Sequence, residues 1–263
     1  MTLTLFLHEI KRNKISLIVW SAALAFMLGI CIVIYPEMQS QMGEISQMFS
    51  DMGAFSDAFG MDQLNFGEFM GYFGVECGNT LGIGGAILGA IVGIGALSKE
   101  ERDHTAELLL TLPVSRIRVV AEKLLFCVFH IFAVNAVVCV VCLIGSAAIS
   151  VDVNYGKMLL ILLSYFLVQI EIMAITFGIS AFLKRGGLGI GIGIGFGLYF
   201  MNILANISEE VEFLKYLTPF GFADSGRIIS EGTLEPISLV VGIVLTAVGI
   251  GLAFWEYNRK DIA

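Results

Sequence analysis

The sequence is poor in charge. Only 14% of its 263 residues are Asp, Glu, Lys or Arg, whereas 57% are hydrophobic. Soluble domains carry roughly 25% charged residues. Apolar runs of roughly 18 or more residues recur here, and each is long enough to cross a bilayer. The composition therefore excludes an ordinary soluble domain. It predicts an all-α polytopic membrane protein, organised as a single transmembrane domain over residues 1–263.

Familiar catalytic and binding motifs are also missing. The sequence has no GxxxxGK[ST] phosphate-binding loop and no HExxH zinc motif, and its three histidines are scattered. Binding of ATP through such a loop is therefore excluded. The five cysteines are odd in number, and most fall in apolar runs, where a cysteine usually packs as a small apolar residue. Cys139 and Cys142 form a CxxC without a second pair. We expect no enzyme, no metal site, no disulfide framework and no nucleic-acid partner.

Six apolar segments have the length of membrane spans. The predicted spans are residues 16–35, 77–98, 119–149, 158–183, 187–206 and 237–257. We expect Tyr35-Pro36 to close the first span, because proline disrupts a helix. We also expect the first turns of the third span, with Glu122 and Lys123, to project below the membrane.

Residues 2–14 alternate between an apolar and a charged helical face and are too short to cross the bilayer. They predict an N-terminal interfacial helix. A secretory signal would also place basic residues before an apolar core. The following run of about 19 residues is longer than a usual signal core and ends without a clear cleavage site, so we expect it to be a retained span.

Basic residues are unevenly distributed between the predicted loops. If both ends lie inside, the inner segments hold twelve of the fifteen lysines and arginines. These are Lys11, Arg12, Lys14, Lys99, Arg102, Arg116, Arg118, Lys123, Lys184, Arg185, Arg259 and Lys260. By the positive-inside rule, this asymmetry predicts cytoplasmic N- and C-termini in the cell membrane. Acidic residues gather instead in the predicted outer loops, 37–76 and 207–236. That charge either favours a cationic partner or product outside, or is simply well solvated.

The densest run of charge lies between the second and third predicted spans, KEERDHTAELLLTLPVSRIRVVAEK from Lys99 to Lys123. Within it, Leu108, Leu109 and Leu112 form the apolar stripe of a short helix. Acidic residues at its start suit the positive end of the helix dipole, and Pro113 ends it. The pattern predicts an amphipathic helix over residues 100–112, in the cytoplasm, ready to dock on another protein.

Two features of the spans and one of a loop leave alternatives open. A carboxylate within a span is costly, so Glu171 in the fourth span either lines a pathway or is a buried, protonated packing residue. Methionines recur at helical spacing in residues 37–76, which favours a helix on the outer lipid surface or a soft lining near a substrate exit. Glycines at four-residue steps in the fifth span allow close helix packing or helix movement. The two sets are Gly189, Gly193 and Gly197, and Gly187, Gly191 and Gly195.

Two segments carry a family resemblance. EERDHTAELLLTLPVSRIRVVAEKLL (100–125) resembles the segment between the second and third spans of ABC-2 type transporter permeases. KYLTPFGFADSGRII (215–229) resembles the segment that those permeases carry before their last span. With the amphipathic start and the six spans, the resemblance covers nearly the whole chain.

The resemblance implies a partner arrangement. Two permeases, either two copies of this chain or this chain and a paralogue, would pair in the membrane above two cytoplasmic ABC ATPase subunits. ATP and Mg would bind to those subunits, and this chain would hold no cofactor. Residues 100–112 would be the coupling helix, and residues 207–231 would partly re-enter the bilayer as a gate. The positions implied in coupling to the ATPase are Glu100, Glu101, His104, Thr105, Glu107, Leu108, Leu109 and Leu112.

The spans offer mostly apolar walls with almost no fixed charge. They favour an amphipathic or hydrophobic cargo, such as a peptide, that reaches the protein from the inner leaflet of the membrane lipid. The compact design is similar to peptide-exporting permeases, including the phenol-soluble modulin exporters. The alternatives are a multidrug or antibiotic efflux permease, a sodium extrusion permease, and a membrane sensor without a transported cargo.

Overall fold

The computed structural model describes residues 3–50, 64–65, 67–102, 115–149, 151–183 and 186–259, with side chains except at 40–50, 100–102 and 209. In this part of the chain, all regular structure is helical. Six helical stretches are long and apolar enough to cross a membrane: Lys14–Gln39, Phe69–Lys99, Arg116–Ala148, Tyr155–Ser180, Leu188–Ile207 and Pro236–Arg259. The prediction of an all-α protein with six candidate spans is confirmed.

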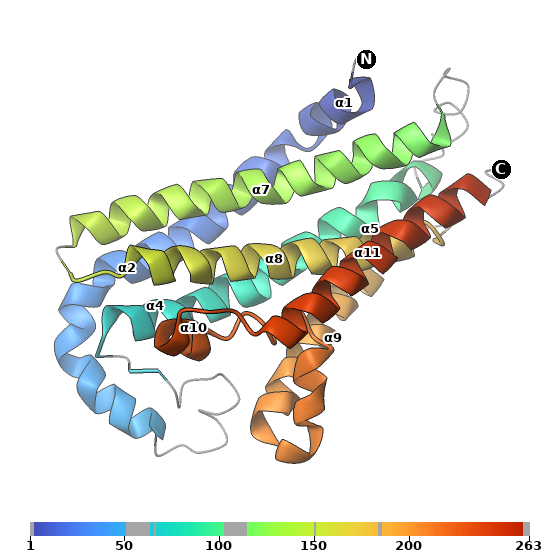
Figure 1. Cartoon of the computed structure of the whole chain (residues 1–263). Helices are drawn as coiled ribbons and strands as arrows, with labels where there is room; N and C mark the ends of the chain where they lie inside the picture. Colours follow the sequence, from blue (N-terminus) through green and yellow to red (C-terminus); the bar gives the residue numbers. More distant parts are fainter. Residues whose placement is uncertain are drawn as a thin grey trace.

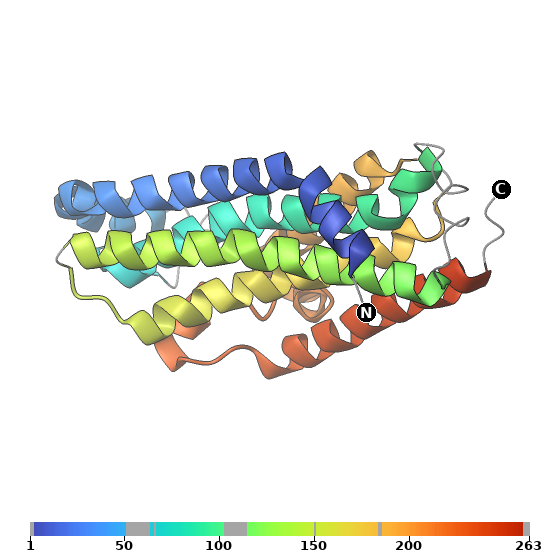
Figure 2. The same ribbon diagram turned by 90° about the horizontal axis from the view of Figure 1, so that it is seen from above.

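The long helices lie alongside one another in an elongated bundle (Figures 1 and 2). The short helix α1 crosses α7 near one end, which is also the end where α11 finishes. The elements are α1 (Thr4–Arg12), α2 (Lys14–Ser50), α4 (Phe69–Cys77), the π-helix η1 (Gly78–Gly85), α5 (Ala86–Arg102), α7 (Arg116–Ala148), α8 (Tyr155–Ser180), α9 (Leu188–Ile207), the 3-10 helix η2 (Glu209–Tyr216), α10 (Ser225–Glu231) and α11 (Pro236–Arg259).

Helix α2 does not end at its proline. Tyr35-Pro36 is expected to close the first span by disrupting its helix, but α2 continues through Pro36 to Ser50; the point where the span leaves the membrane stays a prediction. Tyr35 is fully buried, and its ring packs on Phe69 and Tyr72 with centroids 5.3 and 5.2 Å apart. Its hydroxyl donates to the carbonyl of Gly67 over 2.9 Å. Packing between distant segments therefore outweighs the local effect of proline.

The second span begins earlier than predicted. Helix α4 starts at Phe69 and continues through η1 into α5, so part of the predicted outer loop 37–76 belongs to this span. Phe69 and Phe73 are buried at its start. The stretch of π-helix is rich in glycine, and π-helical turns are often found at functional sites.

Glycines bring α5 and α8 into close contact at the centre of the bundle. A Cβ atom on Gly89 would lie 2.6 Å from the carbonyl oxygen of Gln169 in α8. One on Gly93 would collide with Thr176 and with the Met173 carbonyl, also in α8. Small residues let backbones approach in this way where helices pack in lipid.

The glycines of α9 use one of their two faces inside this chain. A Cβ on Gly191 would lie 3.1 Å from the carbonyl oxygen of Ala90 in α5, so this face packs. A Cβ on Gly189, Gly193 or Gly197 would meet nothing within 4 Å in the described part of the chain. Packing by these three glycines remains a prediction, and it would require a neighbouring subunit.

Gly249 in α11 offers a direct test of close helix packing. A Cβ there would lie 2.5 Å from the carbonyl oxygen of Ala174 in α8, which is backbone and cannot give way cheaply. Gly251 is exposed, and a Cβ there meets nothing within 4 Å. We expect Gly249→Val to destabilise the fold by roughly 1–3 kcal/mol and Gly251→Val to have little effect. Thermal unfolding of the two detergent-solubilised variants checks this, and equal melting temperatures would contradict it.

Candidate functional site

One carboxylate attaches the interfacial helix α1 to α7. Glu122 accepts hydrogen bonds from the backbone N–H groups of Leu5 (2.9 Å) and Phe6 (3.2 Å) and from Nε of Arg118 (2.7 Å). Leu5 and Phe6 lie in the first turn of α1, where backbone donors lack helical partners and negative charge is favoured. The Glu122 side chain is only 4% exposed because α1 covers it.

Lys123 connects three helices at the same level. Its ammonium group donates to the carbonyl oxygen of Ala96 in α5 over 2.7 Å and lies 3.6 Å from Oε1 of Glu9 in α1. The Lys123 residue is 3% exposed. A buried charge is tolerated only when it is paired and hydrogen-bonded. Lys123 therefore holds α1, α5 and α7 in one arrangement.

The base of α7 also reaches α11. Nη1 of Arg116 donates to the carbonyl oxygens of Tyr257 (3.5 Å) and Asn258 (3.3 Å) in the last turn of α11. A positive charge is favoured at a helix C-terminus. Ser115 caps the start of α7 by accepting from the N–H of Arg118 over 3.3 Å. We call the set Glu9, Ala96, Arg116, Glu122 and Lys123 the inner junction, after the side of the membrane on which the sequence predicts it.

The inner junction lies where the predicted coupling segment leaves and rejoins the bundle. Helix α5 ends at Arg102 and α7 begins at Arg116. Glu100 and Glu101 belong to the end of α5 by their backbone. The other predicted coupling positions lie outside the described residues, so their role stays a prediction. These are His104, Thr105, Glu107, Leu108, Leu109 and Leu112.

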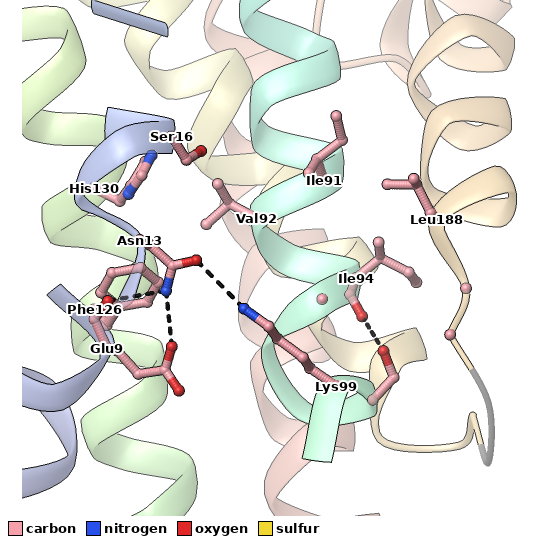
Figure 3. Close-up of a pocket in the computed structure, with 14 residues that line it drawn as sticks. Glu9, Asn13, Ser16, Ile91, Val92, Ile94, Lys99, Phe126, His130 and Leu188 are labelled. Carbon is pink, nitrogen blue, oxygen red and sulfur yellow. Dashed lines mark hydrogen bonds between the residues drawn. The ribbon is translucent and has the colours of Figure 1, made fainter. Parts of the chain in front are cut away.

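A cavity of about 260 Å³ opens beside the inner junction (Figure 3). Asn13 stands at its polar end, where its amide Nδ2 donates to the backbone oxygen and to Oε2 of Glu9, each over 2.9 Å. Nζ of Lys99 lies 3.5 Å from Oδ1 of the same asparagine. The other lining residues are Ser16, Ile91, Val92, Ile94, Gly95, Ser98, Phe126, His130, Gly186, Gly187 and Leu188.

His130 lines this cavity without a hydrogen bond at Nε2. The residue is 2% exposed, and its ring meets that of Phe126 edge-on with centroids 5.5 Å apart. Nε2 is buried and has no partner in the described part of the chain. Leaving a buried polar group unpaired costs roughly 1–3 kcal/mol. A polar ligand atom in the cavity would recover part of that energy.

Glu171 does not face the cavity. It is 3% exposed and lies between α8 and α11, with Oε2 against the position that a Cβ on Gly242 would take. That oxygen has no hydrogen-bond partner among the described residues. A buried carboxyl without a partner is much less costly when neutral. The location favours packing between α8 and α11 over the lining of a pathway, which remains a hypothesis.

The segment before the last span folds into the opposite end of the bundle. Residues 218–223 are buried, and we call 217–223 the outer plug, after the side of the membrane on which the sequence predicts it. The ring of Phe220 packs edge-on against Tyr199 of α9 with centroids 5.5 Å apart. Ser225 donates to the carbonyl of Gly74 in α4 over 3.2 Å and lies 3.5 Å from the Tyr165 hydroxyl. These contacts bury the segment within the bundle, and its partial re-entry into the bilayer as a gate stays a prediction.

Charged caps order the turn between the outer plug and α11. Glu235 accepts from the backbone N–H of Ser238 over 2.9 Å, and its Oε1 lies 3.2 Å from Nη1 of Arg227. Burial alone would raise the pKa of Glu235. The backbone hydrogen bonds from Ser238 and Ile237, with the charge of Arg227, outweigh burial and hold that pKa below its ordinary value. The turn therefore keeps its anionic cap at neutral pH.

Several contacts between helices could not be predicted from the sequence. Asn135 and Gln169 form a reciprocal amide pair between α7 and α8, with N–O distances of 2.8 and 3.2 Å. Glu9 and Asn13 belong to the amphipathic start, but nothing local indicates that Glu9 meets Lys123. Only Arg118 and Glu122 show a detectable pattern, because residues four apart share a helix face. In the part of the chain with described side chains, no group of three His, Cys, Asp or Glu could hold a metal ion.

Comparison with known families shows a match along nearly the whole chain. The family described as ABC-2 family transporter protein matches residues 3–262, from the start of α1 to beyond the end of α11. The match therefore includes both the inner junction and the outer plug. No curated protein matches the chain.

Proposed function

The chain belongs to the ABC-2 family of transporter proteins, and from this membership we propose that it is the permease subunit of an exporter driven by a separate ATPase. Its six candidate spans supply the membrane body. ATP and Mg would bind to the partner ATPase, which would seat on residues 100–112. A second permease subunit, identical or paralogous, would complete the path.

The inner junction is the observation that supports coupling to an ATPase. Residues 103–114 connect α5 to α7, so any force on them reaches both helix ends. Lys123 links those two helices at Ala96 and also pairs with Glu9 of α1. Arg116 extends the connection to α11. Because charged contacts of this kind resist separation, the helices would move together when the ATPase pushes from below.

We propose an amphipathic or hydrophobic cargo, most simply a peptide, that is taken from the inner leaflet and released outside. The apolar helix surfaces support this class. A sodium exporter would instead need several convergent oxygen ligands, and Glu171 offers one carboxylate packed against α11. Efflux of small apolar drugs remains the alternative cargo, and a sensor without cargo remains the alternative function.

ATPase and uptake assays on one preparation separate these alternatives. The permease would be purified with its associated ATPase, reconstituted in vesicles, and supplied with amphipathic helical peptides or with small apolar dyes. ATPase stimulation together with peptide uptake into the vesicles supports peptide export. Stimulation without movement of any compound would indicate a sensor, and uptake of dyes alone would indicate drug efflux.

Leu108 provides a specific test of coupling. As part of the predicted apolar stripe of residues 100–112, it would lie in the ATPase groove. We expect Leu108→Asp to reduce transport at least about tenfold, since burying an unpaired charge costs well over 1.4 kcal/mol, while the spans still insert. Leu159→Ala, at a position 43% exposed on the candidate span α8, serves as the control, because it stays apolar and lies far from residues 100–112 in the sequence. Co-purification of the ATPase and vesicle uptake are the measurements. Normal transport by Leu108→Asp would remove this segment from the coupling role.

A further inference from the structure

The cavity at the inner end combines one polar side with one apolar side. Its polar side is formed by Asn13, Lys99 and the buried His130, and its apolar side includes Ile91 and Leu188 (Figure 3). Ligand sites commonly join a mostly apolar wall with a few convergent polar groups. This lining fits an amphiphile that places its polar end beside Asn13 and the backbone at the start of α9, and its apolar part along the side chain of Leu188.

The volume of the cavity limits what it can hold. At about 260 Å³, it has the volume of roughly nine water molecules, each of which takes up about 30 Å³ in the liquid. Sites for drug-sized ligands span roughly 300–1,000 Å³. The cavity therefore holds a headgroup rather than an amphipathic peptide. The rest of the ligand must lie outside, and the half-exposed Leu188 leads there.

Charge at the cavity favours an anion. Lys99 carries a positive charge on its wall, and the carboxylate of Glu9 is already engaged by Lys123 and Asn13. Among the described residues that line the cavity, Lys99 supplies the positive charge that an anionic ligand would meet. Gly186, Gly187 and Leu188 bring the start of α9 to the cavity, and the N-cap residue Gly187 provides no side-chain cap. An uncapped helix N-terminus adds partial positive charge and free backbone donors.

His130 is an independent sign of a polar occupant. The residue is 2% exposed, and its Nε2 has no hydrogen-bond partner among the described residues. A buried ring nitrogen without a partner is uncommon, because buried polar side-chain atoms are nearly always hydrogen-bonded. A phosphate ester oxygen in the cavity accepts a hydrogen bond from a ring N–H.

We propose that this cavity binds the phosphate headgroup of an anionic phospholipid from the inner leaflet. Lys99, Asn13 and the start of α9 contact the phosphate, and His130 contacts an ester oxygen. The acyl chains leave past Leu188 into the bilayer. A lipid fits better than the cargo, because the cavity admits only a headgroup while the ligand's apolar part has a bilayer beside it. The bound lipid connects Asn13, which lies between α1 and α2, with α5 and α9 next to the inner junction.

Retention of defined lipids by the full-length protein tests the proposal. The chain is released from nanodiscs that contain equal amounts of phosphatidylglycerol and phosphatidylcholine, and bound lipid is counted by native mass spectrometry. We expect the wild-type protein to retain phosphatidylglycerol in preference. We expect Lys99→Met to lower that retention about tenfold, the effect of one charge-assisted hydrogen bond. Lys14→Met is the control. Lys14 is exposed and follows Asn13 directly in the sequence, but it is absent from the cavity lining.

A second variant and two competing ligands distinguish a lipid site from a cargo site and from a free-anion site. Leu188→Trp narrows the opening without changing charge and should also lower retention, while melting temperatures confirm that both variants fold. Equal retention by wild type and Lys99→Met overturns the proposal. Displacement of the lipid by an amphipathic peptide with a free carboxylate overturns it in favour of cargo. Displacement by millimolar inorganic phosphate alone overturns it in favour of a free-anion site. None of these results depends on transport activity, so the proposed function can fail or hold separately.

Discussion

Replacing Glu122 by alanine is expected to release α1 from the bundle and to abolish transport. The carboxylate accepts three hydrogen bonds, two from the first turn of α1 and one from Arg118. Its loss leaves the α1 amides without this acceptor and breaks the ion pair with Arg118. Breaking a buried ion pair costs about 3–5 kcal/mol. The loss here is smaller, because the Arg118 side chain is 34% exposed.

Hydrogen exchange provides the direct readout. In Glu122→Ala, the amides of Leu5 and Phe6 should exchange faster, while amides in the middle of α8 keep their protection. Vesicle uptake should fall in the same preparation because α1 no longer moves with α7. Glu122→Gln separates two effects: its amide oxygen still accepts from the backbone but carries no charge. We expect it to retain part of the protection.

A second ion pair in the same chain is a matched control for the first. Arg227 and Glu231 are also an arginine and a glutamate four residues apart, with Nε and Oε2 separated by 2.9 Å. The Glu231 side chain is 56% exposed, and such surface pairs contribute roughly 0–1 kcal/mol. Glu231→Ala should therefore leave transport unchanged. If Glu122→Ala transports as well as Glu231→Ala, α1 is not part of the transmission.

Local pattern alone predicts the helices of this chain but not where they meet. The apolar runs place the start of the third span at residue 119, and the helix begins at Arg116. The fourth span is predicted to end at residue 183, whereas α8 ends at Ser180. These helix ends depend on hydrophobicity and local capping, both of which can be judged from residues next to each other in the sequence. The prediction at Pro36 failed for a different reason. The contacts that stabilise α2 around this proline come from Phe69 and Tyr72, which are far from it in the sequence.

The glycines of α9 also show that a local pattern does not predict which helix faces pack together. A four-residue period predicts a face, and α9 carries two such sets offset by two residues. Two residues correspond to roughly 200° around a helix, so the sets lie on nearly opposite sides. Only the position of α5 selects Gly191 and Gly195 for contact within this chain. Likewise, the amphipathic pattern predicts α1, but the meeting of Glu9 with Lys123 depends on how the helix docks.

Gly221→Val is expected to displace the outer plug and leave the bundle leaky. A Cβ at this position would collide with the carbonyl oxygen of Lys215 and lie 2.9 Å from Oγ of Ser238. The first obstacle is backbone, so the plug itself must shift. Overpacking of this kind costs roughly 1–3 kcal/mol. Because Phe220 and Phe222 are buried on either side of Gly221, the shift would withdraw apolar contacts from α9 and α11.

Dye leakage distinguishes a displaced plug from an unfolded protein. Vesicles that contain Gly221→Val should lose a trapped polar dye without ATP, while the six spans remain inserted and protected from protease. Thr233→Val, a near-isosteric change at an exposed position of the same region, should leave the vesicles tight. If Gly221→Val stays tight and transports normally, the buried segment supports the fold without closing a path. Leakage that stops when α11 is cross-linked to α8 would locate the seal at the seam where Glu171 meets Gly242.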